Sequence, residues 1–485
     1  MPPSGRVAAL TLTAAALLLV SHAGLLGLPF YWDELGQFIP ASLDLFHSGA
    51  LVPYTTVPNV HPPGVMAYLA GIWLLFGYSI AATRVAMLCL AAAGVTLTYL
   101  ITRRLSPPGA THAPALAAAG LLSISPLFFS QAGMAQLDMP AMVWFALAFW
   151  LFLEDRIVAS AVTCAVLVLV KETGIAAPML FGAWLLKERR WRAALWFFLP
   201  LPGLAAWLLL LRHATGHLFG NAEFTDYNLF YPLHPVRLVL ALVRRCYYVF
   251  VANGNVVGLL ALTLARRLPL WRERRWQVAW AFVALHLLLI SVLGGAVLER
   301  YLLPVFPLVY AAFALALWEL GRWRLAALTA FAVLLLAGLC VNPPFPFPLE
   351  NNLAWTTFVR LEQQAAVFVE ARYPAQTIAT SFPLASALRR PEFGFVQRPL
   401  HLYEIADFTP QKVAALRGHA SVLVLHSALW DPLGLMANPR WSGFLRRYYG
   451  FTSQATPEQV PQLLDARLVA EWSEAGQRMW CFELR

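Results

Sequence analysis

Long apolar stretches recur along the first two thirds of this 485-residue chain, and they restrict its fold more than any other feature. Hydrophobic residues make up 60% of the chain and charged residues only 12%, whereas soluble domains carry about 25% charged residues. Eleven stretches bounded by charge run near 7–28, 80–102, 113–130, 139–153, 157–170, 175–186, 193–211, 246–265, 276–293, 302–320 and 325–341. The sequence therefore predicts a mainly α-helical, polytopic membrane protein with about eleven transmembrane helices.

The first stretch follows Arg6, as the apolar part of a signal peptide follows its basic end. It is longer than the roughly 7–15 apolar residues of such a segment, and many spans follow it. We expect a retained helix.

The loops between these stretches predict the orientation of the helices. Of the 22 Lys and Arg residues in 1–341, 15 fall on one set of alternate loops, which the positive-inside rule makes cytoplasmic. The opposite, extracytoplasmic side receives 29–79, 131–138, 212–245, 294–301 and everything after 341. We expect a bacterial inner-membrane protein whose tail lies outside the cytoplasm.

The tail differs from the rest of the chain, so we divide the sequence into a transmembrane domain, 1–341, and a soluble domain, 342–485. The motif "NPPFPFP" begins the tail and is typical of a stiff linker. A helical pattern over 358–373 is followed by strand-like runs at 377–381, 420–427, 467–472 and 478–484. This order predicts a small α/β domain.

Charge and cysteine content exclude two other classes. The net charge of +10 arises between the apolar stretches, because residues 342–485 carry 13 basic against 12 acidic side chains. No basic stripe or nucleic-acid motif is present, so we expect no nucleic-acid partner. Four of the five cysteines lie in or beside apolar stretches without C-x-x-C spacing, which argues against a disulfide framework and a structural zinc site.

Two segments on the extracytoplasmic side are unusual. Residues 61–79 are apolar but open with Pro-Pro, and we expect an interfacial helix in this first external loop. The stretches 157–170 and 175–186 begin and end on the cytoplasmic side, yet about 14 residues rise only some 21 Å. Lys171 and Glu172 are therefore predicted at the apex of a shallow helix pair, within the membrane, where charged groups normally line a cavity.

Polar residues from separate segments gather on this predicted side, which suggests a site for a lipid headgroup and an aqueous substrate. They are Asp33, Glu34, His61, Asp138, Lys171, Glu172, Arg237, Glu299, Arg300 and Tyr301. Structural explanations also exist for several of them: Asp33 and Glu34 as solvated interface residues, His61 as a turn cap, Asp138 as a helix N-cap, and Arg300 as an interfacial cation.

The order of several motifs resembles that of a known family. "YWDE" follows the first stretch, "HPPG" comes about thirty residues later, and "LFGYS", an Asp in the next short external turn, "KET" and "ERYLLPVFP" follow. Together they resemble the GT-C glycosyltransferases that use polyprenyl-phosphate donors, the group with protein O-mannosyltransferases and lipid A aminoarabinose transferases. The resemblance covers about residues 5–345 and implies transfer of a sugar from a lipid-phosphate donor to an acceptor hydroxyl, with inversion.

The same resemblance implies a role for each residue. Asp33 would be the general base with Glu34 as its partner, and Asp138 would shape the acceptor side or the surroundings of Asp33. The donor phosphate would be bound by His61, Lys171, Arg300 and Tyr301, with Glu172, Glu299 and Arg237 in support. Some relatives carry Lys before Pro-Pro. If His61 is neutral, neutralising the charge of the donor phosphate falls more heavily on Lys171 and Arg300.

Other functions remain open at this point. No cofactor is required, although a divalent metal bridging Asp33, Glu34, His61 and Asp138 is an alternative. A polymerase or ligase for lipid-linked oligosaccharide, a lipid or solute transporter, and an assembly subunit are competing hypotheses. The absence of an internal repeat argues against transport. The acceptor is a protein, lipid A or a surface glycan.

Overall fold

The computed structural model describes residues 4–265, 268–269, 272–341, 350–427 and 438–485, and the chain divides into two compact units. The first contains Met1–Ala23 and Pro40–Leu339, and the second contains Gly24–Ile39 and Cys340–Arg485. The short segment Gly24–Ile39, which includes Asp33 and Glu34, thus packs with the tail rather than with the helices. The predicted division at residue 341 leaves this segment with the transmembrane domain. The predicted Pro-rich linker lies outside the described residues.

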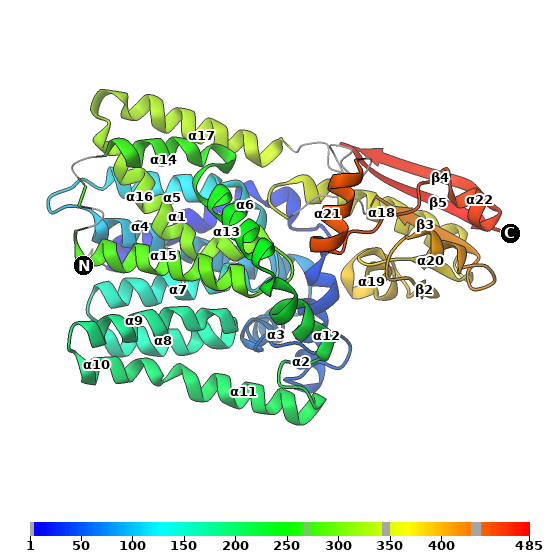
Figure 1. The fold of residues 1–485 in the computed structure, drawn as a ribbon, viewed down its shortest axis with the longest axis horizontal. Helices are drawn as coiled ribbons and strands as arrows, with labels where there is room; N and C mark the ends of the chain where they lie inside the picture. The colour runs from blue at the N-terminus through cyan, green and yellow to red at the C-terminus, as the bar shows by residue number, and fades with distance from the viewer. Residues whose placement is uncertain (1–3, 266–267, 270–271, 342–349, 428–437) are drawn as a thin grey trace. The chain divides into compact units, whose positions relative to one another are not determined.

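The first unit consists of helices (Figure 1). They are α1 Ser4–Ser21, α2 Ile39–Ser48, α3 Gly64–Phe76, α4 Ile80–Leu105, α5 Ala113–Ile124, α6 Pro126–Gln131, α7 Asp138–Leu153, α8 Ile157–Val170, α9 Ala176–Lys187, α10 Trp191–Leu195, α11 Pro200–Thr215, α12 Ala222–Thr225, α13 Pro235–Phe250, α14 Asn255–Leu264, α15 Arg274–Val292, α16 Phe306–Glu319 and α17 Arg324–Cys340. Helices α4 and α16 are the most deeply buried of the long helices, while α17 and the α10–α11 segment expose apolar surface.

The helices agree in outline with the predicted spans. Within the described residues, five helices are long and apolar enough to cross a membrane, or six if α13 and the segment containing α14 form one span bent by 42°. Five shorter apolar helices include α7 and α8. The protein is therefore a multi-pass membrane protein, and the number eleven stays a prediction. The first predicted span extended to residue 28, but α1 ends at Ser21.

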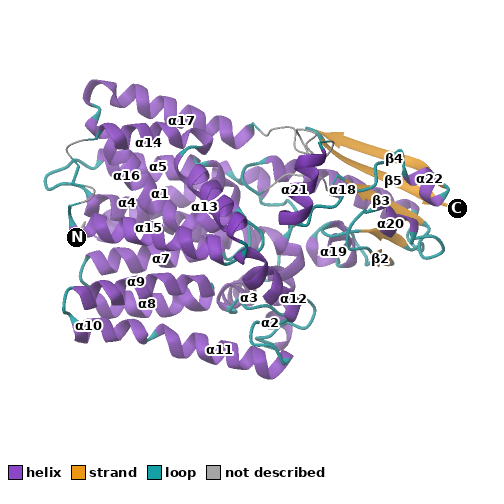
Figure 2. Cartoon of the chain, viewed as in Figure 1, coloured by secondary structure: helices purple, strands orange, loops and turns teal. Residues whose placement is uncertain are grey.

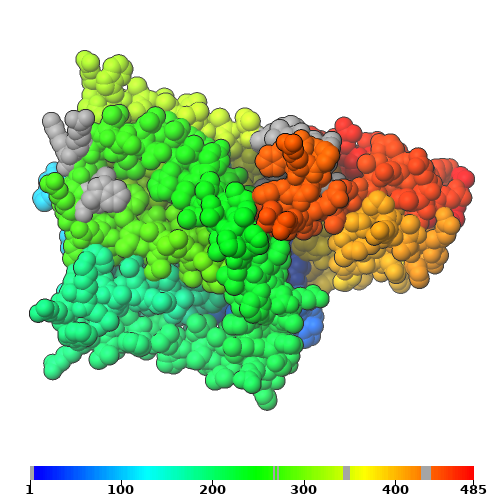
Figure 3. Space-filling view, viewed as in Figure 1, coloured from blue at the N-terminus to red at the C-terminus, as the bar shows by residue number. Residues whose placement is uncertain are grey.

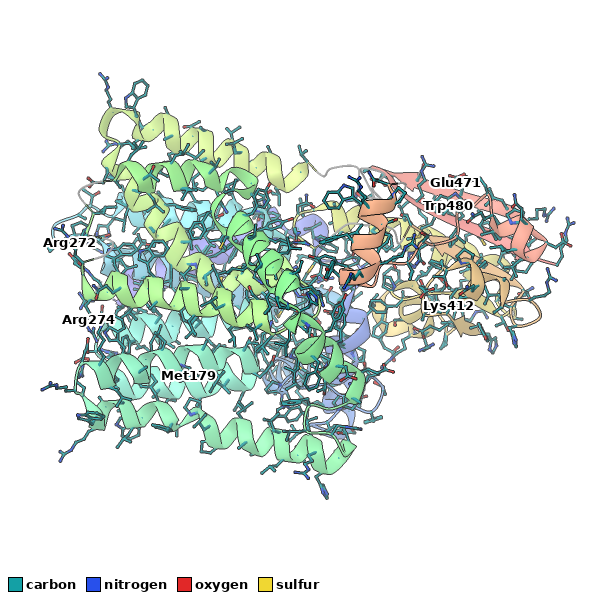
Figure 4. The ribbon with its side chains drawn as sticks, in the orientation of Figure 1. Met179, Arg272, Arg274, Lys412, Glu471 and Trp480 are labelled. Carbon is teal, nitrogen blue, oxygen red and sulfur yellow. The ribbon has the colours of Figure 1, made fainter. Side chains whose placement is uncertain are left out.

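The predicted cytoplasmic loops meet at one end of the helical unit. Arg104 pairs with Glu154 at 3.1 Å, Arg190 with Asp155 at 2.6 Å, and Arg274 with Glu188. Figure 4 labels Arg272 and Arg274 at the end of the unit that also holds α10. These contacts bring four of the predicted cytoplasmic loops together, and the side of the membrane on which they lie stays a prediction.

The pair formed by α8 and α9 has the predicted form. Helix α8 ends at Val170 and α9 begins at Ala176, with the short 3-10 helix η3, Glu172–Ile175, between them. Met179 on α9 is exposed, and in the space-filling view α8 to α11 occupy one edge of the helical unit (Figure 3). Helix α3 covers most of the apolar run 61–79, and its position at the membrane interface stays a prediction.

The second unit combines helices with a sheet of five strands (Figure 2). The strands are β1 Ile378–Thr380, β2 Leu402–Glu404, β3 Val422–His426, β4 Ala466–Glu474 and β5 Gln477–Leu484, in the order β2-β1-β3-β5-β4. The helices are α18 Ala354–Arg372, α19 Leu384–Arg389, α20 Pro410–Ala414, α21 Pro439–Tyr449 and α22 Val460–Leu464. The sequence predicted α18 and four of the strands and missed the three-residue β2.

The sheet is mixed, and its core explains why. Strands β1, β2 and β3 are parallel, whereas β3 pairs antiparallel with β5 and β5 with β4. Strand β3 is buried along its whole length, as a central strand requires. The small C-terminal α/β domain is therefore confirmed as a fold, and all five cysteines are unpaired.

Candidate functional site

Asp138 lies at the centre of a buried group of charges in the helical unit. Its Oδ1 accepts a hydrogen bond from Lys171 Nζ at 2.5 Å, and Arg300 Nε lies 3.1 Å from its Oδ2. The three side chains are at most 8% exposed. The expected N-cap role for Asp138 is not seen, because Leu137 holds the N-cap position and Asp138 is the first residue of α7. Each member comes from a different segment: the start of α7, the end of α8, and the 3-10 helix η8, Glu299–Val305.

Tyr301 completes this group with its aromatic face. Lys171 Nζ lies 4.1 Å from the centroid of the Tyr301 ring, a cation–π distance. The carbonyl oxygen of Tyr301 accepts a hydrogen bond from His286 Nε2 at 2.8 Å, which fixes η8 to the buried face of α15. We name Asp138, Lys171, Arg300 and Tyr301 the cation cluster.

His61 and Glu172 form a second pair in the same unit. His61 Nδ1 donates to Glu172 Oε2 at 2.9 Å, and the His61 ring contacts Phe224 edge-on at 5.7 Å between centroids. Gly64 explains how the "HPPG" motif comes so close to α8. A Cβ on Gly64 would lie 2.4 Å from the carbonyl oxygen of Leu169, so only glycine fits.

The neighbours Lys171 and Glu172 thus have different partners in the helical unit. Lys171 pairs with Asp138 of α7, whereas Glu172 pairs with His61 from the first external loop. Adjacent residues on an irregular segment point in different directions, so two separate elements are tied to the apex of the α8–α9 pair.

The remaining predicted residues lie around η8 and α13. Glu299 pairs with Arg244, and Arg237 donates to the carbonyl oxygens of Tyr231 at 2.8 Å and Gly295 at 3.0 Å. Arg237 is thereby a brace between α13 and the loop before η8.

Sequence reasoning missed Arg244, Arg245 and His286. Arg245 is buried, donates to the carbonyl of Ile290 at 2.6 Å, and lies 5.8 Å from the Tyr301 ring. Arg245 could have been recognised from its spacing. The buried stripe of α13 consists of residues four positions apart, Arg237, Ala241, Arg245 and Val249. The predicted span 246–265 began after Arg237 and Arg245, so it left both arginines out of the helix.

The charges of the cation cluster favour an anion. Two cations meet one carboxylate, so the trio of Asp138, Lys171 and Arg300 has a formal charge of +1, and Arg245 adds a further cation beside Tyr301. In a site shielded from water, such charges attract a phosphate strongly.

Asp33 and Glu34 belong to the second unit. Glu34 is fully buried, and its Oε2 accepts a hydrogen bond from the backbone N–H of Tyr31 at 2.9 Å. Asp33 directly precedes the π-helix η2, Glu34–Phe38. Burial raises the pKa of Tyr31 well above its usual range, and the charges of Glu350, Glu362 and Asp33 raise it further, so Tyr31 stays protonated.

Metal ligation was a hypothesis for Asp33, Glu34, His61 and Asp138. Over the ranges that the structure describes, no group of three or more His, Cys, Asp or Glu side chains is arranged to hold a metal ion. Dependence on a divalent metal stays a question for experiment.

Comparison with known proteins adds independent findings. The model of glycosyltransferase family 87 matches residues 59–294, which include His61, Asp138 and Lys171. ArnT from Cupriavidus metallidurans bound to undecaprenyl phosphate is similar in structure, with a TM-score of 0.59, 16% identity, and coverage of 99% of this chain and 98% of that one. This chain has the GT-C fold. No curated protein matches the sequence.

A second GT-C structure is similar at lower identity. The oligosaccharyltransferase AglB from Archaeoglobus fulgidus, in complex with an inhibitory peptide and a dolichol-phosphate, has a TM-score of 0.50 and 10% identity, covering 98% of this chain and 74% of that one. The GT-C fold and the family match bear out the resemblance that the motifs indicated.

Proposed function

We propose that this protein transfers a sugar from a polyprenyl-phosphate-linked donor to an acceptor hydroxyl at the extracytoplasmic face of a bacterial inner membrane. The acceptor is a hydroxyl of a protein, of lipid A or of a surface glycan. The cation cluster carries this proposal, because it places Lys171 and Arg300 around one buried carboxylate, on a fold shared with a protein bound to undecaprenyl phosphate.

The charge balance of the reaction explains why cations are needed. In the donor, phosphate is a diester with one negative charge. The acceptor oxygen attacks the anomeric carbon from the opposite face, the bond from that carbon to the phosphate oxygen breaks, and the lipid phosphate leaves as a monoester with close to two charges. Cations that meet the developing charge stabilise the transition state more than the bound donor, which accelerates the reaction.

Each residue has a role in this proposal. Lys171 and Arg300 bind the phosphate, Tyr301 supports the Lys171 ammonium, and Asp138 positions both cations. His61 donates a hydrogen bond near the phosphate, held by Glu172, while Glu299 and Arg237 hold η8 and α13 in place. Asp33 takes the proton of the acceptor hydroxyl as general base, and Glu34 closes the turn that presents Asp33.

The steps require no metal, because the leaving group is already a phosphate and the proton passes to a carboxylate. We expect turnover in EDTA to equal turnover in added Mg²⁺ or Mn²⁺. A loss of activity in EDTA that either metal restores would replace this part of the proposal with metal-assisted catalysis.

The test is release of polyprenyl phosphate from a panel of lipid-phosphate monosaccharides, by purified protein in lipid discs with mixed acceptors. We expect release from at least one donor, and a decrease of about 10²–10⁴-fold in Asp33→Asn, the usual contribution of a general base. Binding of undecaprenyl phosphate should be unchanged in that variant.

Three results would contradict the proposal. Undiminished release in Asp33→Asn would remove Asp33 as the base. No release from any monosaccharide donor, with release from lipid-linked oligosaccharides, would favour the polymerase or ligase hypothesis instead. Transport of the lipid without any bond cleavage would favour the transporter.

A further inference from the structure

The backbone around Asp33 has an unusual conformation. Trp32, the residue before it, has φ of +53°, a left-handed value that bulky residues rarely adopt. The N–H groups of Leu35 and Gly36 both donate to the carbonyl of Trp32, at 2.9 and 3.0 Å, and the π-helix η2 follows. Such a turn persists only when its surroundings determine it.

One aromatic ring of the second unit contacts both sides of this turn. The ring of Phe382 meets the ring of Trp32 edge-on, with 5.0 Å between centroids. A Cβ added to Gly36 would lie 2.9 Å from Phe382 Cε2, closer than real Cβ contacts. Trp32 and Gly36 flank Asp33, so Phe382 touches the residue before it and the residue three positions after it.

The ring of Phe382 lies on a well-anchored segment. It follows β1, whose Thr380 hydroxyl donates to the carbonyl of Val424 at 2.8 Å, and Ser381 Oγ is 3.1 Å from Nε2 of the buried His426. Helix α19 begins two residues after Phe382 and packs against η2.

A second aromatic contact holds the start of the turn. The fully buried ring of Tyr31 packs against Trp355 and Phe358 of α18, with centroids 5.9 and 6.2 Å away. Two elements of the second unit, α18 and the end of β1, therefore fix the segment on which Asp33 is carried.

We propose that Phe382 is a positioning residue for Asp33, and that residue 36 is glycine because the Phe382 ring occupies the space of a side chain. The inference rests on the proposed function, in which Asp33 is the general base. A base must lie within hydrogen-bond distance of the proton it removes, so a small displacement of the turn slows the chemical step.

The experiment compares Gly36→Ala, Phe382→Leu and the double variant in the full-length protein. The methyl group of Gly36→Ala collides with the ring and displaces Asp33, so we expect kcat to fall by roughly 10–100-fold with little change in the donor KM. Phe382→Leu removes the ring and should restore activity to Gly36→Ala, so that the double variant is more active than Gly36→Ala alone. Gly27→Ala is the matched control, because no atom lies within 4 Å of its added Cβ.

A second measurement requires no turnover. Hydrogen–deuterium exchange of the peptide covering Trp32–Phe38 should rise in Gly36→Ala, stay unchanged in Gly27→Ala, and return toward the parent rate in the double variant. Binding of undecaprenyl phosphate should not change in any of them, which distinguishes loss of positioning from loss of fold.

The outcomes separate this inference from the proposed function. If Asp33→Asn abolishes activity while Gly36→Ala keeps it, the positioning role of Phe382 is wrong and the base assignment stands. If Asp33→Asn keeps full activity, both are wrong. A double variant that shows the product of the two single losses, with no recovery in exchange, would also overturn the role of Phe382.

Discussion

The cation cluster and the turn that carries Asp33 both contain buried charged side chains, but different forces hold them. In the cluster, Lys171 and Arg300 are fixed by charge on Asp138, and three separate segments meet through ion pairs. In the turn, Asp33 is fixed by packing, through Tyr31 and Trp32 against the rings of the second unit. One region is held by electrostatics and the other by shape.

This difference agrees with the proposed roles, in which the cation cluster binds the phosphate and Asp33 takes the acceptor proton. Charges in a buried site bind an anion strongly, but they are costly when a partner is removed. A general base must lie within hydrogen-bond distance of the proton it removes, and packing of the flanking backbone sets this position. Variants should therefore affect binding and folding through the first region and the rate of the chemical step through the second.

The largest effect is expected from Asp138→Asn. This change leaves Lys171 and Arg300 without the carboxylate they share, and breaking a buried ion pair costs about 3–5 kcal/mol. We expect a lower melting temperature that undecaprenyl phosphate restores more in the variant than in the parent, because the phosphate replaces the lost charge. Asp155→Asn is the control, since its pair with Arg190 is largely exposed and contributes about 0–1 kcal/mol. Equal stabilisation of parent and variant by the lipid would separate Asp138 from the phosphate site.

Lys171→Met should lower turnover by about 10²–10³-fold, the usual effect of removing one donor to a developing anion. It should also weaken binding of undecaprenyl phosphate, unlike Asp33→Asn. Lys187→Met at the other end of α9 should have no effect, because that side chain is exposed at the end of the unit with the basic loops. Unchanged binding of undecaprenyl phosphate to Lys171→Met would contradict the assignment of phosphate binding to the cation cluster.

His61→Phe should have a smaller effect, a decrease in kcat/KM of roughly tenfold, since one hydrogen bond to a charged group is lost while the contact with Phe224 is kept. Glu172→Gln should give a similar loss, and the double variant little more than either. The exposed His112→Phe serves as the control. Fully additive losses would show that the two residues act separately.

The smallest effect concerns stability in the second unit and its dependence on pH. Glu362 on α18 is fully buried, neither of its oxygens has a hydrogen-bond partner among the described residues, and burial raises its pKa well above the ordinary value. In the unfolded chain this carboxyl has its ordinary pKa, so it loses its proton at a lower pH than in the folded protein. Stability is full below the ordinary carboxyl pKa of about 4.3 and is lost as the pH rises toward the raised pKa.

Glu362→Gln removes this dependence. The melting temperature of the variant should exceed that of the parent by a margin that grows from pH 5 to pH 8, by roughly 2–4 °C for each 1 kcal/mol. Glu471→Gln, on the exposed side of β4 (Figure 4), should show no such trend. A margin that is constant with pH would mean that Glu362 is charged in the folded protein.

Much of the fold follows from sequence patterns. Apolar runs bounded by charge predicted the position of most helices, because a helix in a membrane must be apolar over its length. Helix α8 has the predicted bounds, and α18 and β3 were visible in the tail. The patterns failed where polar residues enter a helix, as on α13, whose stripe of Arg237 and Arg245 resembles a loop in composition.

The sequence by itself determined that this is a multi-pass helical protein with a small α/β domain, and it picked out the residues of the cation cluster by motif and charge. It could not pair them, since Lys171 contacts Asp138 across 33 positions and its neighbour Glu172 contacts His61 across 111. Only the tertiary structure assigned the segment with Asp33 to the unit formed by the tail. The physical reason is that apolar length is a local property, whereas ion pairing and aromatic packing depend on which distant segments the fold brings together.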